Sequence, residues 1–252
     1  MKALRQLITE WMPWKRVSAP EIRAGNERLD HHLRRLFELM EINCVLDVGA
    51  NQGQYGRFLR QLGYRGKIIS FEPAADDYAI LKQAADRDPL WSAHEFALGD
   101  EEGVLSMNVT SDSLFNSFLQ PNDFIVQQGL RVVGVKEVEV RRLDDVFDSL
   151  ISDIPEPRVY LKIDTQGYEL NVLYGATGVL GQMLALQAEV SVKHVYEDVP
   201  NYLEAISAMT GLGYELTGMF PIARDNALRV VEFDCVMIRA SAAGESTSLH
   251  SP

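Results

Sequence analysis

The stretch "VLDVGANQGQYGRFLRQLG", residues 45–63, decides the fold. It joins a short apolar run that ends in Asp47 to a turn with two glycines, and then to a segment with helical periodicity. Glycine allows a sharp turn and the close approach of a ligand, and the free amides at the start of a helix attract electron-rich groups. The stretch therefore predicts a strand, a ligand-binding turn and a helix.

The same alternation continues along the chain. The runs "GKIISFEP" and "RVYLKIDTQG" lead into helix-period segments at 75–86 and 168–175, and "WSAHEFALGD" and "MLALQAEVSV" are further strand-like runs. Near the end, "GYELTGMF" and "VVEFDCVMIRA" read as an antiparallel pair that closes the sheet. The predicted fold class is α/β: a doubly wound, mostly parallel Rossmann-like sheet with an antiparallel final strand and helices on both faces.

The chain length of 252 residues fits one large domain with terminal segments. We expect an N-terminal helical extension over residues 1–40, a ligand-binding domain over 41–240, and a small, polar tail over 241–252 that is disordered. Residues 1–40 predict two short helices in a region where basic residues outnumber acidic ones. These helices either cover the sheet or, through Trp11 and Trp14, contact a membrane surface.

A long section, residues 100–157, separates two of the predicted strands. Within it "EGVLSMNVT" and "KEVEVRRLDDV" read as strands, and "SDSLFNSFLQPNDF" reads as a polar loop. Loops of this length in compact domains are usually functional or disordered, and the three phenylalanines of this one favour order.

Composition narrows the class of protein. A formal net charge of −12 disfavours nucleic acid as a partner, because binding to phosphates requires clustered Lys and Arg. Cys44 and Cys235 lie in strand-like runs and are expected to be reduced core thiols. No apolar stretch approaches the roughly 20 residues that span a bilayer, so we expect no transmembrane segment and a cytoplasmic location.

A second acidic residue supports a nucleoside-containing ligand. Glu72 ends the next strand, roughly 20 residues after Gly53, where doubly wound folds place a carboxylate that holds ribose hydroxyls. Together with Asp47 and Gly49 it marks the carboxyl ends of adjacent strands. The dinucleotide fingerprint G-x-G-x-x-G is missing, which disfavours a nicotinamide cofactor.

These motifs in combination resemble one family. "VLDVGANQGQY", "FEP", "ALGD" and "LKIDTQGYELNVLYGA", in this order, are similar to the S-adenosylmethionine-dependent methyltransferases of the FkbM type, which have the class I methyltransferase fold. The resemblance extends from residue 43 to about residue 240. One position departs from the pattern: Gln166 stands where the family usually has glutamate.

The resemblance implies a cofactor site. The turn around the methionine part of S-adenosylmethionine would have Asp47 at its base, Glu72 would take the ribose hydroxyls, and Pro73 would lie beside the adenine. The residues implied to bind the cofactor are Asp47, Gly49, Ala50, Asn51, Gly53, Tyr55, Glu72, Pro73, Ala97, Leu98 and Asp164.

Catalytic candidates follow the fourth and fifth strands. Asp164 ends one strand, and Lys162 lies two residues earlier on the same face, either in a structural ion pair or in contact with the acceptor. Glu189 ends the next strand. His194, in the loop beyond it, is either a general base or a surface residue. Asn116 and Ser117 are substrate-binding candidates: they either contact the cofactor or acceptor, as the resemblance implies, or lie in an ordered surface loop anchored by phenylalanines.

The residues and the resemblance together predict an O-methyltransferase that acts on a hydroxyl of a sugar, glycolipid or other secondary metabolite. A base or a divalent metal such as magnesium would help the hydroxyl to lose its proton. The alternatives are a nicotinamide-dependent oxidoreductase and a non-catalytic cofactor-binding scaffold, which only Gln166 favours. The expected partner is a small-molecule or glycan acceptor, and homo-oligomerisation is left open.

Overall fold

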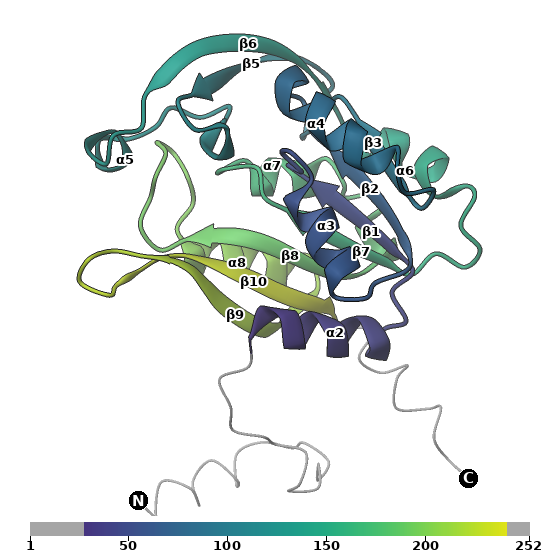
Figure 1. Cartoon of the computed structure of the whole chain (residues 1–252). Helices are drawn as coiled ribbons and strands as arrows, with labels where there is room; N and C mark the ends of the chain where they lie inside the picture. Colours follow the sequence, from purple (N-terminus) through teal and green to yellow (C-terminus); the bar gives the residue numbers. More distant parts are fainter. Residues whose placement is uncertain (1–27, 241–252) are drawn as a thin grey trace, which may run out of the picture.

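A seven-stranded sheet forms the central layer of the computed structural model, which describes residues 28–240 (Figure 1). The strand order is β3-β2-β1-β7-β8-β10-β9. Its strands are β1 (Cys44–Val48), β2 (Lys67–Phe71), β3 (Trp91–His94), β7 (Val159–Ile163), β8 (Met183–Ser191), β9 (Tyr214–Arg224) and β10 (Val230–Arg239). β10 pairs antiparallel with both of its neighbours, and the pairs among β3, β2, β1, β7 and β8 are parallel. The predicted fold class is confirmed.

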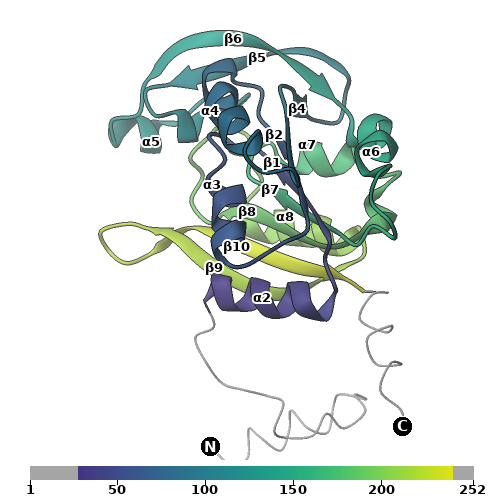
Figure 2. The same cartoon turned by 45° about the vertical axis from the view of Figure 1, so that its right-hand side comes forward.

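Helices cover both faces of this sheet (Figures 1 and 2). On one face α2 (Leu29–Leu39), α3 (Gln54–Gln61) and α4 (Ala75–Ala85) bury Leu33, Leu59 and Leu81 in a cluster with Val45 and Tyr160. The other face carries α6 (Leu143–Ile151), α7 (Glu169–Tyr174) and α8 (Tyr202–Gly211). The short helix η2 (Leu180–Gln182) lies between α7 and α8 in the chain. The core is thus divided into two apolar layers by the sheet.

A small second sheet lies beside the first and arches above it in Figure 2. It consists of β4 (Ala97–Leu98), β6 (Val132–Arg141) and β5 (Gly103–Thr110), in that order. The connection between β5 and β6 carries η1 (Ser113–Phe115) and α5 (Asp123–Gln127). This section is ordered, as its phenylalanines predict.

Two boundaries differ from the sequence-based prediction. The run "WSAHEFALGD" is not one strand: β3 pairs with β2 in the large sheet, whereas β4 pairs with β6 in the small one. The end of "KEVEVRRLDDV" is helical, because α6 begins at Leu143 and buries Leu143 and Phe147 at helical spacing. The helix is selected by the burial of these side chains against the sheet, which the eleven-residue run does not reveal by itself.

Helix α2, which covers one face of the large sheet, also contacts the edge strand β9. His32 of α2 contacts the Thr217 hydroxyl at 2.9 Å and the ring of Phe220 at a centroid distance of 5.1 Å. The earlier predicted helix, with Trp11 and Trp14, and the predicted tail lie outside the described residues. The predicted domain boundaries therefore stay predictions.

Two further expectations concern composition. Cys44 and Cys235 are buried free thiols, and burial raises the pKa of each to about 12, so both are protonated at neutral pH. Among residues 28–240, no helix combines the length and the apolar character needed to cross a membrane.

A close contact between the end of α7 and the segment after β4 gives the first prediction. Gly175, at the end of α7, has no room for a side chain, because a methyl group there would overlap the backbone carbonyl of Gly99 after β4. Gly175→Ala should lower the free energy of unfolding by roughly 1–3 kcal/mol, measured by urea denaturation. Gly103→Ala, at a position open to solvent, is the control and should change it by less than about 0.5 kcal/mol. Equal stability of the two variants would contradict this packing.

Candidate active site

A cavity of about 390 Å³ opens at the carboxyl ends of β1, β2, β7 and β8. Its walls come from the turns that follow these strands, from β4, and from the loop that carries η1. One end is formed by the turn after β1 and by Glu72, and the other by polar side chains of β7, β8 and β10. Such a position, above the switch point of a doubly wound sheet, is where these folds bind ligands.

The turn after β1 is closely fitted to its surroundings. Gly49, Asn51 and Gly53 have φ angles of +74°, +45° and +84°, a region that favours glycine and tolerates asparagine. A side chain on Gly49 would overlap the backbone carbonyl of Asp164. The N–H groups of Gly49 and Ala50 both donate to the Phe71 carbonyl, at 3.1 and 3.0 Å. The turn is thereby held between β2 and β7.

Most of the predicted cofactor residues line the cavity. Glu72 accepts hydrogen bonds from the backbone N–H groups of Asn51 and Ala74, both at 2.8 Å. Burial raises the pKa of Glu72 to about 7, against these two N–H groups, which lower it. The predicted cofactor residues that line the cavity are Gly49, Ala50, Asn51, Tyr55, Glu72, Pro73, Ala97, Leu98 and Asp164. Gly53 lies outside it and is the N-cap of α3.

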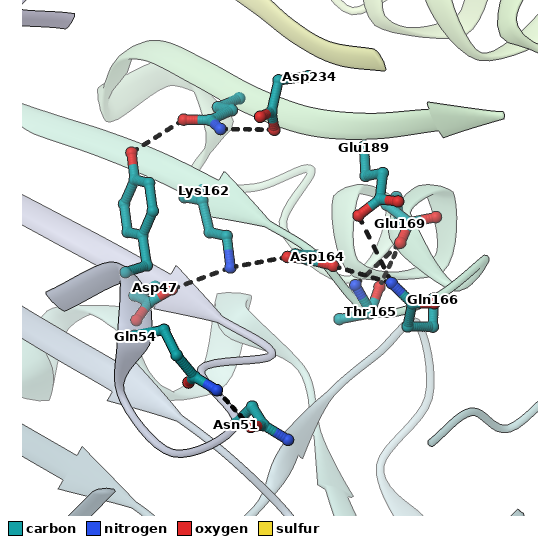
Figure 3. Close-up of polar contacts among 12 residues, drawn as sticks. Asp47, Asn51, Gln54, Lys162, Asp164, Thr165, Gln166, Glu169, Glu189 and Asp234 are labelled. Atoms are coloured by element: carbon teal, nitrogen blue, oxygen red, sulfur yellow. Dashed lines mark hydrogen bonds and ion pairs between the residues drawn. The ribbon is translucent and has the colours of Figure 1, made fainter. Parts of the chain in front are cut away.

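Lys162 carries a buried positive charge between two carboxylates (Figure 3). Its Nζ lies 3.2 Å from Asp47 Oδ1 and 3.3 Å from Asp164 Oδ2, and 5.1 Å from the centroid of the Tyr55 ring. Burial acts to lower the pKa of Lys162, but the Asp164 and Asp47 carboxylates outweigh it and raise this pKa above its ordinary value. Asp47 is itself buried beneath the cavity and also accepts a hydrogen bond from Ser70 Oγ at 3.1 Å.

Asp164 and Glu189 form a carboxyl pair at the end of the cavity lined by β7, β8 and β10. Partial burial acts to raise the pKa of Asp164, but the Lys162 charge and hydrogen bonds from Glu189 and Gln166 outweigh it, so this pKa is lowered. The pKa of Glu189 is raised well above its ordinary value, first by burial and then by the carboxylates of Asp164 and Glu232. The two shifts are opposite in direction: the surroundings favour the ionised form of Asp164 and the protonated form of Glu189.

Two residues of this end were missed by the sequence reasoning. Gln187 accepts a hydrogen bond from the Tyr55 hydroxyl at 2.8 Å and donates one to Asp234 at 2.6 Å. Burial raises the pKa of Asp234 to about 6. Gln187 and Glu189 alternate with apolar residues in β8. This period of two could have indicated that Gln187 lies on the same face of the strand as Glu189.

Of the three candidates in loops, Asn116 and Ser117 line the cavity and His194 does not. Ser117 is buried, and its Oγ donates to the Gln166 carbonyl at 2.7 Å; Asn116 Oδ1 accepts from the Thr110 N–H at 2.9 Å. Both residues line the cavity. His194 is exposed and is not among the lining residues, although its carbonyl accepts a hydrogen bond from Asn122. The structure therefore gives the His194 base hypothesis no support.

The metal hypothesis also finds no site. Within the described part of the chain, no group of three or more His, Cys, Asp or Glu residues is placed to hold a metal ion. A requirement for magnesium stays an untested prediction.

Comparison with known proteins identifies the family. Residues 47–216 match the family model described as the methyltransferase FkbM domain. The chain belongs to the FkbM methyltransferase family. The resemblance drawn from the motifs is confirmed, and the protein is a methyltransferase whose methyl donor is S-adenosylmethionine.

Named relatives are distant. The 2-O-methyltransferase NoeI of Sinorhizobium fredii is 28% identical over 81% of this chain and 85% of its own length. The 31-O-demethyl-FK506 methyltransferase FkbM of Streptomyces tacrolimicus is 28% identical over 57% of this chain and 63% of its own. Among solved structures, Aeropyrum pernix fibrillarin with natively bound S-adenosyl-L-methionine is 10% identical with a TM-score of 0.46, covering 78% of this chain and 66% of that one.

The burial of Glu72 gives a prediction for cofactor binding. If its carboxylate accepts hydrogen bonds from ribose hydroxyls, S-adenosylhomocysteine binds the ionised form. Its affinity should then fall by roughly tenfold per pH unit below a pH of about 7, measured by calorimetry.

Glu72→Gln tests the assignment directly. It should weaken binding at pH 8 by roughly 1–3 kcal/mol and remove most of the pH dependence. Asp86→Asn, at the C-cap of α4, removes an exposed carboxylate and should behave like the wild type. Wild-type affinity of Glu72→Gln at pH 8 would refute the ribose assignment.

Proposed function

We propose that this methyltransferase transfers the methyl group to a hydroxyl oxygen of a sugar, glycolipid or other secondary metabolite. The observation that carries the proposal is the continuity of one cavity, from the Gly49 turn and Glu72 to the ionised carboxylate of Asp164. The names of both NoeI and FkbM describe transfer to oxygen, on different acceptors. Methyl transfer to a hydroxyl needs alignment above all, together with a group that receives the proton.

The cofactor end of the cavity supplies the alignment. S-adenosylmethionine supplies a sulfonium methyl group, which is transferred to the acceptor oxygen. In our proposal Gly49, Ala50 and Asn51 follow the methionine part of the cofactor closely, since the turn has no side chain larger than a methyl at its two first positions. Glu72 holds the ribose, and Pro73, Ala97 and Leu98 border the adenine.

Asp164 is the proton acceptor that the geometry favours. It lines the cavity, and the Lys162 ammonium at 3.3 Å keeps its carboxylate ionised. As the acceptor oxygen bonds to the methyl carbon, its O–H bond breaks and the proton passes to an Asp164 oxygen. Lys162 is protonated and has no lone pair, so we assign it to positioning Asp164 and not to proton abstraction. Glu189 also lines the cavity and acts as a hydrogen-bond donor to Asp164.

The remaining expectations are part of the proposal. A glycan acceptor, a homo-oligomer and a cytoplasmic location stay predictions. The nicotinamide-dependent alternative is overturned by membership of a methyltransferase family. A non-catalytic scaffold would bind S-adenosylhomocysteine and yield no methylated product from any acceptor.

Activity tests the proposal. The purified protein, supplied with methyl-labelled S-adenosylmethionine, is screened against free sugars, glycolipids and hydroxylated macrolides, and the labelled atom is located by mass spectrometry. Methyl ethers are the expected products. Absence of product across the panel, or transfer to nitrogen or carbon, would contradict the proposal.

With an acceptor in hand, Asp164→Asn should lower kcat by roughly 10²–10⁴-fold while affinity for S-adenosylhomocysteine changes little. His194→Ala is the matched test of the other base candidate, and it should retain nearly wild-type turnover because the side chain is exposed outside the cavity. The opposite ranking of these two variants would assign the base to His194.

A further inference from the structure

Gln166, the residue that departs from the family pattern, lies between the carboxyl groups of Asp164 and Glu189 (Figure 3). Its Nε2 is 3.2 Å from Asp164 Oδ1 and 3.5 Å from Glu189 Oε2. On its other side, Oε1 accepts a hydrogen bond from the Tyr196 hydroxyl at 3.0 Å. The amide therefore joins three groups from the ends of β7 and β8 and from the loop beyond.

The surroundings fix the direction of this amide. An ionised carboxylate only accepts hydrogen bonds, so the nitrogen of Gln166 has to face Asp164, and the oxygen is left for Tyr196. Tyr196 is itself buried, and its hydroxyl also lies 3.0 Å from the Phe115 carbonyl. The backbone of Gln166 is held as well, because its carbonyl accepts a hydrogen bond from Ser117 Oγ at 2.7 Å.

The charged groups around Asp164 and Glu189 favour a single negative charge on the pair. Lys162, from β7, is already shared between Asp47 and Asp164. Three further acidic groups surround the pair: Glu232 and Asp234 of β10 and Glu169 of α7. The charge of Asp164 acts to raise the pKa of all three, and the charge of Glu232 acts to raise that of Glu189. A second ionised carboxylate beside Asp164 would be repelled from several sides at once.

We infer that Gln166 is a positioning residue that holds Asp164 and Glu189 as a carboxyl pair sharing a single proton, with the negative charge kept on Asp164. The inference rests on the proposed function for its role in methyl transfer. The acceptor O–H bond breaks as the O–CH₃ bond forms, the proton moves to Asp164, and Glu189 keeps the proton that it already holds. The Asp164 side chain is 36% exposed, so its proton passes to solvent once the product leaves.

A glutamate at position 166 would act against this arrangement. It would remove the N–H donors that stabilise the ionised Asp164 and add a carboxylate beside two others. Both changes make Asp164 harder to ionise. In this chain glutamine is therefore compatible with catalysis and is not the mark of a lost active site.

The first experiment needs no acceptor. Carbon-13 NMR follows the carboxyl carbons of Asp164 and Glu189 in the full chain from pH 4 to 9, with assignments from Asp164→Asn and Glu189→Gln. At pH 7 one ionised and one protonated carboxyl group are expected. Gln166→Glu should move the ionisation of Asp164 to higher pH by about one unit or more. Gln61→Glu, which adds the same charge at an exposed position on α3, should leave it unchanged.

Two results would overturn the inference: both carboxyl groups ionised at pH 7, or the same titration in Gln166→Glu as in the wild type. Gln166→Leu, which removes the bridge without adding charge, and Tyr196→Phe, which frees the amide oxygen, cover the case in which Gln166→Glu fails to fold. Each should shift the Asp164 titration in the same direction by a smaller amount, and no shift in either would also refute the positioning role.

The second experiment uses turnover with an acceptor from the screen. Gln166→Glu should lose more than tenfold in kcat at pH 6 and recover to within about threefold at pH 9, with S-adenosylhomocysteine affinity unchanged. A pH-independent loss would indicate a merely structural role and contradict the inference. The two proposals fail separately: a shared proton without any methylated product refutes the proposed function alone, and product formation with independent carboxyl titrations refutes the pair alone.

Discussion

The buried ammonium group of Lys162 is the constraint on which the site depends. An unpaired charge in a protein interior costs several kcal/mol, so a lysine at this depth requires carboxylate partners. Strand pairing supplies the first, because Asp47 of β1 lies beside Lys162 of β7 in the register of the sheet. The second is Asp164, two residues further along the chain, immediately after the end of β7. The ion pair within the sheet thereby sets the charge of a carboxylate in the cavity.

The two faces of the sheet have different tasks. Asp47, Lys162 and Gln187 are neighbours across β1, β7 and β8, and they form a polar row on the face covered by α3, whose Tyr55 hydroxyl bonds to Gln187. The alternate residues, such as Leu46 and Leu161, point into the apolar cluster shared with α6 and α7. The period of two along a strand lets the same three strands build a core on one side and the floor of a polar cavity on the other.

Sequence reasoning was strongest where chemistry is local. The turn at Gly49 and the carboxylate of Glu72 could be predicted because each motif follows its own strand within a few residues, and the structure places both on one cavity. Contacts between distant segments were beyond it. Asp234 reads as an ordinary strand residue, and its place beside Gln187 follows only from the antiparallel pairing of β10 with β8. The second sheet was missed for the same reason, since β4 is too short to be distinguished from β3 without its partner β6. His194 is the converse case: its position in the chain suggested a role as base, and the exposure of its side chain does not support that hypothesis.

Gln166 shows why a family pattern has to be read through its surroundings. Taken from the sequence, a glutamine in place of a glutamate removes an acid from an active site and suggests lost function. In the structure, this position faces the carboxyl groups of Asp164 and Glu189, and the nearby ammonium group of Lys162 already pairs with Asp47. A neutral donor satisfies both carboxyl groups at once, whereas a further acid would add repulsion that Lys162 cannot offset. The substitution therefore changes how the proton of the site is held, while the carboxylate that faces the cavity stays in place.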